Sequence, residues 1–159
     1  MAYTTIDDPS EYFTITLYAG NGSDDRSITN SANAGNFKPD WVWGKNRSQA
    51  GRHTWSDSSR GATKNIFSER TDAESTEADV LQAFETNGFQ VGTDTRLNSN
   101  GDNFVAWQWK ANGGTTSSNS GGTITSTVQA NTTAGFSIIT YTGNFTDNQT
   151  IGHGLSQAP

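Results

Sequence analysis

Apolar and polar residues alternate along several short segments of this chain, a pattern that predicts β-strands rather than helices. The first such segment is Phe13–Tyr18, where Phe, Ile and Leu alternate with Thr, Thr and Tyr. Successive side chains of a strand point to opposite faces of a sheet. We therefore expect Phe13, Ile15 and Leu17 to face the core and the threonines to face solvent.

The segment Phe104–Lys110 alternates in the same way, with Val105, Trp107 and Trp109 on one face and polar residues on the other. The inner face of a β-sandwich needs large side chains, which predicts that both tryptophans are buried. Trp55 is flanked by Thr and Ser. Its context fits either the rim of the core or an exposed contact.

Further strands and turns are indicated around these two segments. Asn87-Gly88 between two apolar runs predicts a β-hairpin. Charges cluster in Glu69–Asp79, which predicts a surface loop with room for one helical turn started by Asp72. The other expected strands are Trp41–Trp43, His53–Asp57, Lys64–Ser68, Val80–Phe84, Phe89–Gly92, Thr123–Val128 and Phe136–Tyr141.

The chain also repeats part of itself. Phe13–Ile28 aligns without a gap with Phe136–Ile151, with Phe, Ile, Tyr, Gly, Asn, Asp and Ile at matching places, and such self-similarity marks modular arrays. We expect these residues to be the front end of a longer protein. The expected divisions are an N-terminal docking arm (1–12), a first β-sandwich module (13–111), a Gly/Ser/Thr-rich linker with a closing strand (112–134), and the start of a second, truncated repeat (135–159).

Composition agrees with an all-β fold. The 159 residues include 17 glycines and are rich in Asn, Ser and Thr, while only 31% are hydrophobic. A helical bundle needs Ala, Leu, Glu and Lys at helical spacing, which this chain lacks. We predict a two-sheet antiparallel β-sandwich of the lectin or jelly-roll kind, preceded by an N-terminal arm.

Charge and cysteine content narrow the function classes. Ten basic and 16 acidic residues give a net charge of -6, and no basic cluster is present to neutralise phosphates, so nucleic acid is not an expected partner. No apolar stretch approaches the length of a membrane span, and the N-terminus lacks a signal-peptide pattern, which predicts synthesis in a cytoplasm and no membrane partner. The absence of cysteine rules out disulfides and thiolate metal sites.

The sequence contains only weak signals for catalytic or metal-binding sites. Asn98, Asn100 and Asp102 resemble the start of an EF-hand loop, but the later glutamate is missing, so we expect a turn and no metal. His53 and His153 fall in different expected modules, and no Gly-x-Ser-x-Gly motif occurs. We therefore predict a protein that is not an enzyme and that needs no cofactor.

The N-terminal arm is the main candidate for protein docking. It contains Tyr3 and Ile6 among threonines and the acidic Asp7 and Asp8, and Tyr12 follows at its end. Such a segment is too short to fold alone, but its aromatic and β-branched residues suit docking by strand addition or by hydrophobic pegs. A disordered terminus is the alternative, and the arm's composition favours docking.

Six stretches of this sequence occur in an order that is typical of one family. They are Tyr12-Phe13 to Gly20-Asn-Gly22, Pro39-Asp-Trp-Val-Trp43 with Lys45-Asn-Arg47, Arg60-Gly61-Ala62, Asn87-Gly88-Phe89 with Val91-Gly92, Val105-Ala-Trp-Gln-Trp-Lys-Ala111, and Gly135-Phe-Ser-Ile-Ile-Thr-Tyr-Thr-Gly143 with Gly152-His-Gly-Leu155 and Ala158-Pro159.

This set resembles a domain of virion proteins from marine bacteriophages, especially those that infect cyanobacteria and pelagic alphaproteobacteria. The resemblance spans Tyr12 to Pro159 and implies a lectin-type or SPRY-like β-sandwich that often occurs in tandem. One departure is Gly44, where relatives tend to have an aliphatic residue after the second tryptophan of the Trp-Val-Trp stretch. That departure predicts a looser end to this strand.

The resemblance and the repeat together predict a bacteriophage virion structural protein, the N-terminal, particle-proximal region of a tail fibre. The expected partners are other virion proteins, either a tail adaptor or nozzle or the capsid, and further copies of the chain in a homo-oligomer, a trimer if it belongs to a fibre. The alternatives are a capsid decoration or head-fibre protein, and a glycan-binding module in which Trp55 contacts the sugar.

Overall fold

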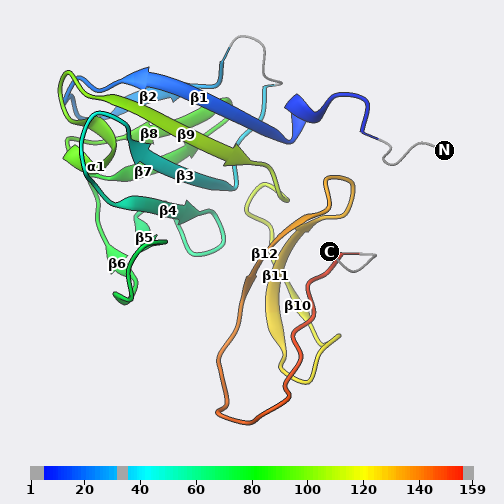
Figure 1. Cartoon of the computed structure of the whole chain (residues 1–159). Coiled ribbons are helices and arrows are strands. Elements are labelled where there is room, and N and C mark those ends of the chain that lie inside the picture. Colours follow the sequence, from blue (N-terminus) through cyan, green and yellow to red (C-terminus); the bar gives the residue numbers. More distant parts are fainter. Residues whose placement is uncertain (1–5, 32–35, 156–159) are drawn as a thin grey trace.

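The computed structural model describes residues 6–31 and 36–155, and almost all of their regular structure is β (Figure 1). The strands are short and antiparallel, which confirms the prediction of an all-β, sandwich-like fold. The elements are the 3-10 helix η1 (Pro9–Glu11), the strands β1 (Phe13–Ala19), β2 (Arg26–Thr29), β3 (Trp41–Asn46), β4 (His53–Asp57), β5 (Lys64–Phe67), β6 (Ser75–Thr76), β7 (Leu81–Glu85), β8 (Gly88–Val91), β9 (Asn103–Trp109), β10 (Ser117–Asn119), β11 (Ser126–Asn131) and β12 (Phe136–Thr140), and the helix α1 (Thr95–Asn98).

Two of the three sheets form the sandwich. The larger sheet has the order β1-β9-β3-β4-β5-β6, and the smaller has the order β2-β8-β7. The predicted hairpin around Asn87-Gly88 is present as β7 and β8, with Gly88 at a φ of 122° that favours glycine. A cluster of buried side chains from both sheets and from α1 fills the space between them: Ile28, Val42, Val80, Leu81, Phe89, Val91, Leu97 and Ala106.

The predicted orientation of β1 is wrong. Leu17 is 62% exposed and Ile15 45% exposed, whereas Thr14 and Thr16 are buried. The reason is Tyr18, which lies on the threonine face and packs its ring against Phe89 and Phe104 in the core, at centroid distances of 6.2 and 5.2 Å. A strand has only two faces, so burying Tyr18 turns the three aliphatic and aromatic residues outward.

The predicted burial of Trp107 and Trp109 is wrong for the same kind of reason. The inner face of β9 consists of Phe104, Ala106 and Gln108, each fully buried. Gln108 Nε2 donates a hydrogen bond to Thr16 Oγ1 on β1 at 2.8 Å, so this buried amide donor has a partner inside the sandwich, whereas the side-chain oxygen of Gln108 has none. Both tryptophans therefore lie on the outer face of the large sheet, half-buried.

The loose strand end predicted from Gly44 is also wrong. Strand β3 continues through Gly44 to Asn46 and stays paired with both neighbours. A side chain at Gly44 would collide with Leu97 of α1, which is itself buried. The glycine thus lets α1 pack against the sheet. In Glu69–Asp79 the structure has the short strand β6 rather than a helical turn.

A third sheet, of order β10-β11-β12, occupies the C-terminal part of the chain. Residues 112–134, where composition indicated a linker, contain β10 and β11, and β12 from the expected second repeat pairs with β11. An isolated bridge between Ile124 and Ile151 adds the segment after β12 to this unit. Figure 1 shows the third sheet beside the sandwich, at the end of β9.

Buried polar groups hold the third sheet to the sandwich. The fully buried carboxylate of Asp40 accepts hydrogen bonds from the backbone amides of Ala111 and Gly113 at 2.7 and 2.9 Å. From β11, the fully buried amide of Gln129 donates to Ser58 Oγ at 3.0 Å and accepts from two amides of the same 112–114 loop at 3.1 and 2.7 Å. Residues 111–114, which follow β9, are therefore held to both the sandwich and β11.

Candidate binding face

The outer face of the large sheet is a regular grid of mostly apolar side chains with charged or polar residues at one edge, which we call the tryptophan face. Antiparallel pairing places outward residues of neighbouring strands directly opposite one another. The rows, read across β1, β9, β3 and β4, are Phe13–Trp109–Trp41–Asp57, Ile15–Trp107–Trp43–Trp55 and Leu17–Val105–Lys45–His53.

Contacts between the rings stabilise this face. Trp41 stacks on Trp109 at a centroid distance of 4.8 Å, and Trp43 lies 5.0 Å from Trp107. Trp55 meets Trp41 and Trp43 edge-on, at 5.2 and 5.7 Å. Such offset and edge-to-face pairs contribute beyond the area that they bury. The five tryptophans thus form one half-buried aromatic layer outside the core.

Strand β12 covers one end of the tryptophan face. Phe136 stacks on Trp41 at 5.7 Å and on Trp109 at 6.1 Å, nearly parallel to Trp41. Nothing in the described chain covers the opposite edge in the same way, where Ile15 and Leu17 remain exposed. The face is therefore divided into a covered row and an open region along β1.

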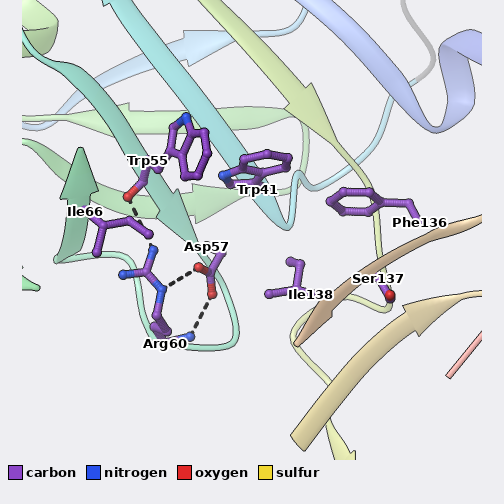
Figure 2. A pocket seen from close by; sticks show the side chains of 8 residues that line it. All are labelled: Trp41, Trp55, Asp57, Arg60, Ile66, Phe136, Ser137 and Ile138. Atoms are coloured by element: carbon purple, nitrogen blue, oxygen red, sulfur yellow. Dashed lines mark hydrogen bonds and ion pairs between the residues drawn. The ribbon is translucent and has the colours of Figure 1, made fainter. Parts of the chain in front are cut away.

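A pocket lies where β12 meets the tryptophan face, with a cavity of about 170 Å³ (Figure 2). Most of its wall is apolar. An apolar cavity of about 150 Å³ is large enough for one six-membered ring. The lining residues are Trp41, Trp55, Asp57, Arg60, Ile66, Phe136, Ser137 and Ile138.

The charged groups of the pocket are paired with each other. Arg60 Nε donates to Asp57 Oδ2 at 2.6 Å, and Arg60 Nη1 forms a second ion pair with Glu74 at 3.1 Å. The guanidinium also donates to the carbonyl of Trp55 at 3.3 Å. This arrangement suits orientation of a bound ring through hydrogen bonds at its edge while the ring lies against indole. It provides no unpaired base for proton transfer.

The structure places Trp55, the predicted sugar contact, in this pocket. Its neighbours there were not predicted, because Phe136 and Ile138 come from a segment far along the chain. The only sequence signal for them is the repeat, in which Phe136 and Ile138 occupy the places of Phe13 and Ile15. That signal does not say where β12 lies.

The predicted docking arm is partly joined to the sandwich. Asp8 begins η1, accepting hydrogen bonds from Ser10 N and Ser10 Oγ at 2.9 and 2.6 Å, and these bonds lower the pKa of its carboxyl. The carbonyl of Tyr12 accepts from Lys110 N at 2.8 Å, and the Lys110 ammonium lies 5.5 Å from the Tyr12 ring. Ile6 is half-buried and Asp7 exposed, while Tyr3 lies outside the described residues.

Residues 98–102, which end α1 and follow it, stabilise the fold through hydrogen bonds. Asn98 is fully buried, and its side chain donates to the carbonyls of Ser23 and Gly92, at 2.8 Å each. Hydrogen bonds from Asn46, Gln49 and Ser99 lower the pKa of Asp102. Within residues 6–31 and 36–155, no group of three or more His, Asp or Glu side chains is placed to hold a metal ion.

The two histidines lie apart, as their sequence positions indicated. His53 is in the third row of the tryptophan face, on β4. His153 follows β12, and its Nδ1 accepts a hydrogen bond from Leu155 N at 3.0 Å. The part of the chain that the structure describes contains no helix long and apolar enough to cross a membrane.

The fold and the site together define a β-sandwich-like protein with an outward aromatic face and a small ring-sized pocket at its end. The chain belongs to the DUF7483 family, a domain of unknown function, whose model matches residues 8–159. That match extends across the expected module, linker and second repeat. No curated protein and no solved structure matches the chain.

Proposed function

We propose that this chain is a structural, non-catalytic protein of a bacteriophage virion, the particle-proximal region of a tail fibre that is assembled in the host cytoplasm. In this role the chain binds other virion proteins and further copies of itself. The resemblance of its six sequence stretches to phage virion domains supports this function, and the repeat agrees with the tandem copies of such domains.

The tryptophan face is the observation that carries the proposal. Monomeric soluble proteins rarely expose a large contiguous apolar surface, and such surfaces mark sites of interaction. Here the open region includes Ile15 and Leu17, at 45% and 62% exposure, beside the half-buried Trp107 and Trp43. Aromatic residues held in a rigid sheet provide contact area at little cost in conformational entropy.

The test is the composition of purified particles of a phage whose genome encodes this chain. Tails and capsids are separated and their proteins identified by peptide mass spectrometry, and cross-linked particles show which proteins touch it. We expect this chain in the tail fraction, cross-linked to a tail protein. Recovery with the capsid would support a capsid decoration or head fibre instead. Absence from the particles would refute a virion role.

Within this function, the N-terminal arm is the proposed attachment segment. Replacing Tyr3 and Ile6 together by Ala should reduce incorporation into particles, because it removes the aromatic and the β-branched side chain of the arm. The melting temperature of the isolated variant, compared with that of the wild type, separates a docking defect from a folding defect. Thr4→Ser is the matched control. Equal incorporation of the double variant and the wild type would contradict docking by the arm.

A second candidate function, glycan binding, is favoured by the pocket at Trp55. A cavity with two indoles, an aromatic ring and a paired arginine and carboxylate at its edge suits one sugar ring. A glycan array, followed by calorimetry of any ligand it finds, tests this idea. We expect Trp55→Ala to weaken binding at least tenfold and Trp107→Ala, on the same face outside the pocket, to have little effect. Equal losses in both variants would contradict a pocket-specific site.

A further inference from the structure

Large apolar side chains are exposed in two separate places on this molecule. In the part of the chain that the structure describes, they are Ile15 and Leu17 on β1, and Tyr141 and Phe145 just after β12. Figure 1 shows β1 at one end of the molecule and the loop after β12 at the other. The two patches therefore cannot cover each other within one chain.

The loop after β12 reproduces the turn after β1. In the first turn Asn21 Oδ1 accepts a hydrogen bond from Ser23 N at 2.9 Å, and in the second Asn144 Oδ1 accepts from Thr146 N at 3.1 Å. The sequence repeat is thus also a repeat of local conformation.

The backbone angles agree as well, with one difference in residue type. Asp25 and Asn148, at matching places, have φ values of 51° and 59°. Gly22 has a φ of 70°, and its counterpart is Phe145, with a φ of 57°. Glycine adopts this conformation freely, whereas a bulky residue is strained in it. The second turn therefore holds a phenylalanine where the backbone favours glycine, and the ring is fully exposed.

The first turn is anchored from outside. Asn98 accepts hydrogen bonds from Asn21 N and Gly22 N, at 3.0 and 2.9 Å, through its side-chain and backbone oxygens. In the described chain, the side-chain hydrogen bonds of residues 143–149 stay within the second turn. The second turn thus displays a strained aromatic ring without such an anchor. Strained backbone conformations cluster at functional sites such as ligand clamps, so this exposed ring is a candidate contact.

We propose that Phe145 of one copy of this chain docks on the open region of the tryptophan face of a second copy, against Ile15 and Leu17. The contact joins two different surfaces, so it is head-to-tail, and repeated copies form a closed ring or an open filament. The molecule already shows one phenylalanine on this face, since Phe136 stacks on Trp41 and Trp109. Phe145 supplies a second ring to the part that β12 leaves open.

Charge agrees with this contact. Leu17 pairs across the sheet with Val105, which pairs with Lys45. The Lys45 ammonium donates to two backbone carbonyls, at 2.7 and 3.3 Å, and so retains a third donor. Asp147 lies two residues after Phe145 and can meet Lys45 when the ring lies on Leu17.

The inference rests on the proposed homo-oligomer and names its contact surfaces. Analytical ultracentrifugation of the purified chain over a range of concentrations tests it. We expect the wild type to associate, and Phe145→Gly to weaken association at least tenfold. Because glycine relieves the strain at this φ, this variant should fold at least as stably as the wild type. Asn148→Gly is the matched control, since it relaxes the same turn without removing an apolar side chain, and should associate like the wild type.

A mixing experiment identifies the geometry. Leu17→Thr damages the acceptor face and Phe145→Gly damages the donor loop, so each variant alone should be monomeric. A mixture of the two retains one intact donor and one intact acceptor, and should form dimers that grow no further. A monomeric wild type would overturn the inference, and so would wild-type oligomers that persist in Phe145→Gly. Persistent oligomers would leave the proposed homo-oligomer standing, and particle composition tests the virion role separately.

Discussion

Asp40 should be one of the most sensitive positions of this protein, although it lies in no predicted site. Its carboxylate is fully buried between the sandwich and the loop that leads to the third sheet. It accepts hydrogen bonds from Ala111 N, Gly113 N and Ser58 Oγ, at 2.7, 2.9 and 2.6 Å. Replacement by Ala removes all three acceptor contacts and leaves a cavity.

The expected loss of unfolding free energy in Asp40→Ala depends on which hydrogen-bond donors are left without an acceptor. Ala111 is buried, so its amide is left unsatisfied, whereas Gly113 is exposed and its amide can bind water. Ser58 retains a nearby acceptor in Gln129 Oε1, at 3.3 Å. A buried unsatisfied donor costs about 1–3 kcal/mol, and loss of a hydrogen bond to a charged group costs about as much. We expect Asp40→Ala to lower the unfolding free energy by about 3 kcal/mol.

Asp40→Asn should cost less, about 1 kcal/mol, because one oxygen remains for the loop amides and the new amino group can donate to Ser58. Urea denaturation measures both values, and calorimetry should show a melting temperature lower by roughly 6–12 °C for the Ala variant. Asp7→Ala, at an exposed position, is the control and should be neutral within about 0.5 kcal/mol.

Hydrogen exchange provides a local readout of the same perturbation. In the Asp40→Ala variant, the exchange rate of the Ala111 amide should rise above the rates of the amides in the sandwich core, because the Ala111 amide loses its acceptor. The reasoning would be refuted if Asp40→Ala were as stable as the wild type, or if the Asn variant were the less stable of the two.

Two further predictions concern the packing around α1. Gly44→Ala should lower the free energy of unfolding by about 2 kcal/mol, because the added methyl meets the buried Leu97. Gly51→Ala is the control, since there is space for a methyl at that position, and it should be neutral in the same denaturation assay. Equal stabilities of the two variants would show that Leu97 moves aside freely. Burial alone would raise the pKa of Asp94, but hydrogen bonds from Arg96 outweigh it, so the pKa of Asp94 is lowered in the folded state. Its contribution to stability is therefore present above the unfolded-state pKa of about 4 and is lost as the pH falls below that value. Melting temperatures between neutral pH and strongly acidic pH should show a smaller acid-induced decrease for Asp94→Asn than for the wild type, and parallel curves would contradict this assignment.

Much of the secondary structure follows from the sequence alone. Alternation located β1 and β9 to within one residue, because period two is a property of the local chain. Asn87-Gly88 located a hairpin, because its backbone angles are accessible to these residue types without help from the rest of the fold. The repeat aligned residues 21–25 with residues 144–148, and the structure shows that these two turns share their local conformation.

The candidate site could not be read from the sequence in this way. Alternation shows that Trp107 and Trp109 share a face with Val105, but it does not show which face is inward, and Gln108 on the opposite face is the buried one. That choice depends on which side of the large sheet the strands β2, β7 and β8 cover. Trp55 was a candidate from its neighbours, but a pocket exists only because β12 brings Phe136 against Trp41.

The sequence by itself determined where strands and turns form, since these depend on neighbouring residues through propensity, alternation and turn chemistry. Only the tertiary structure decided that polar Thr16 and Gln108 would pair inside while five tryptophans lie outside. The physical reason is that burial is decided by contacts between segments far apart in the chain. The hydrogen bond between Gln108 and Thr16 offsets part of the cost of burying these two polar side chains, and stacked indoles stabilise one another at the surface. Hydrophobicity alone therefore did not decide which face of each strand is buried.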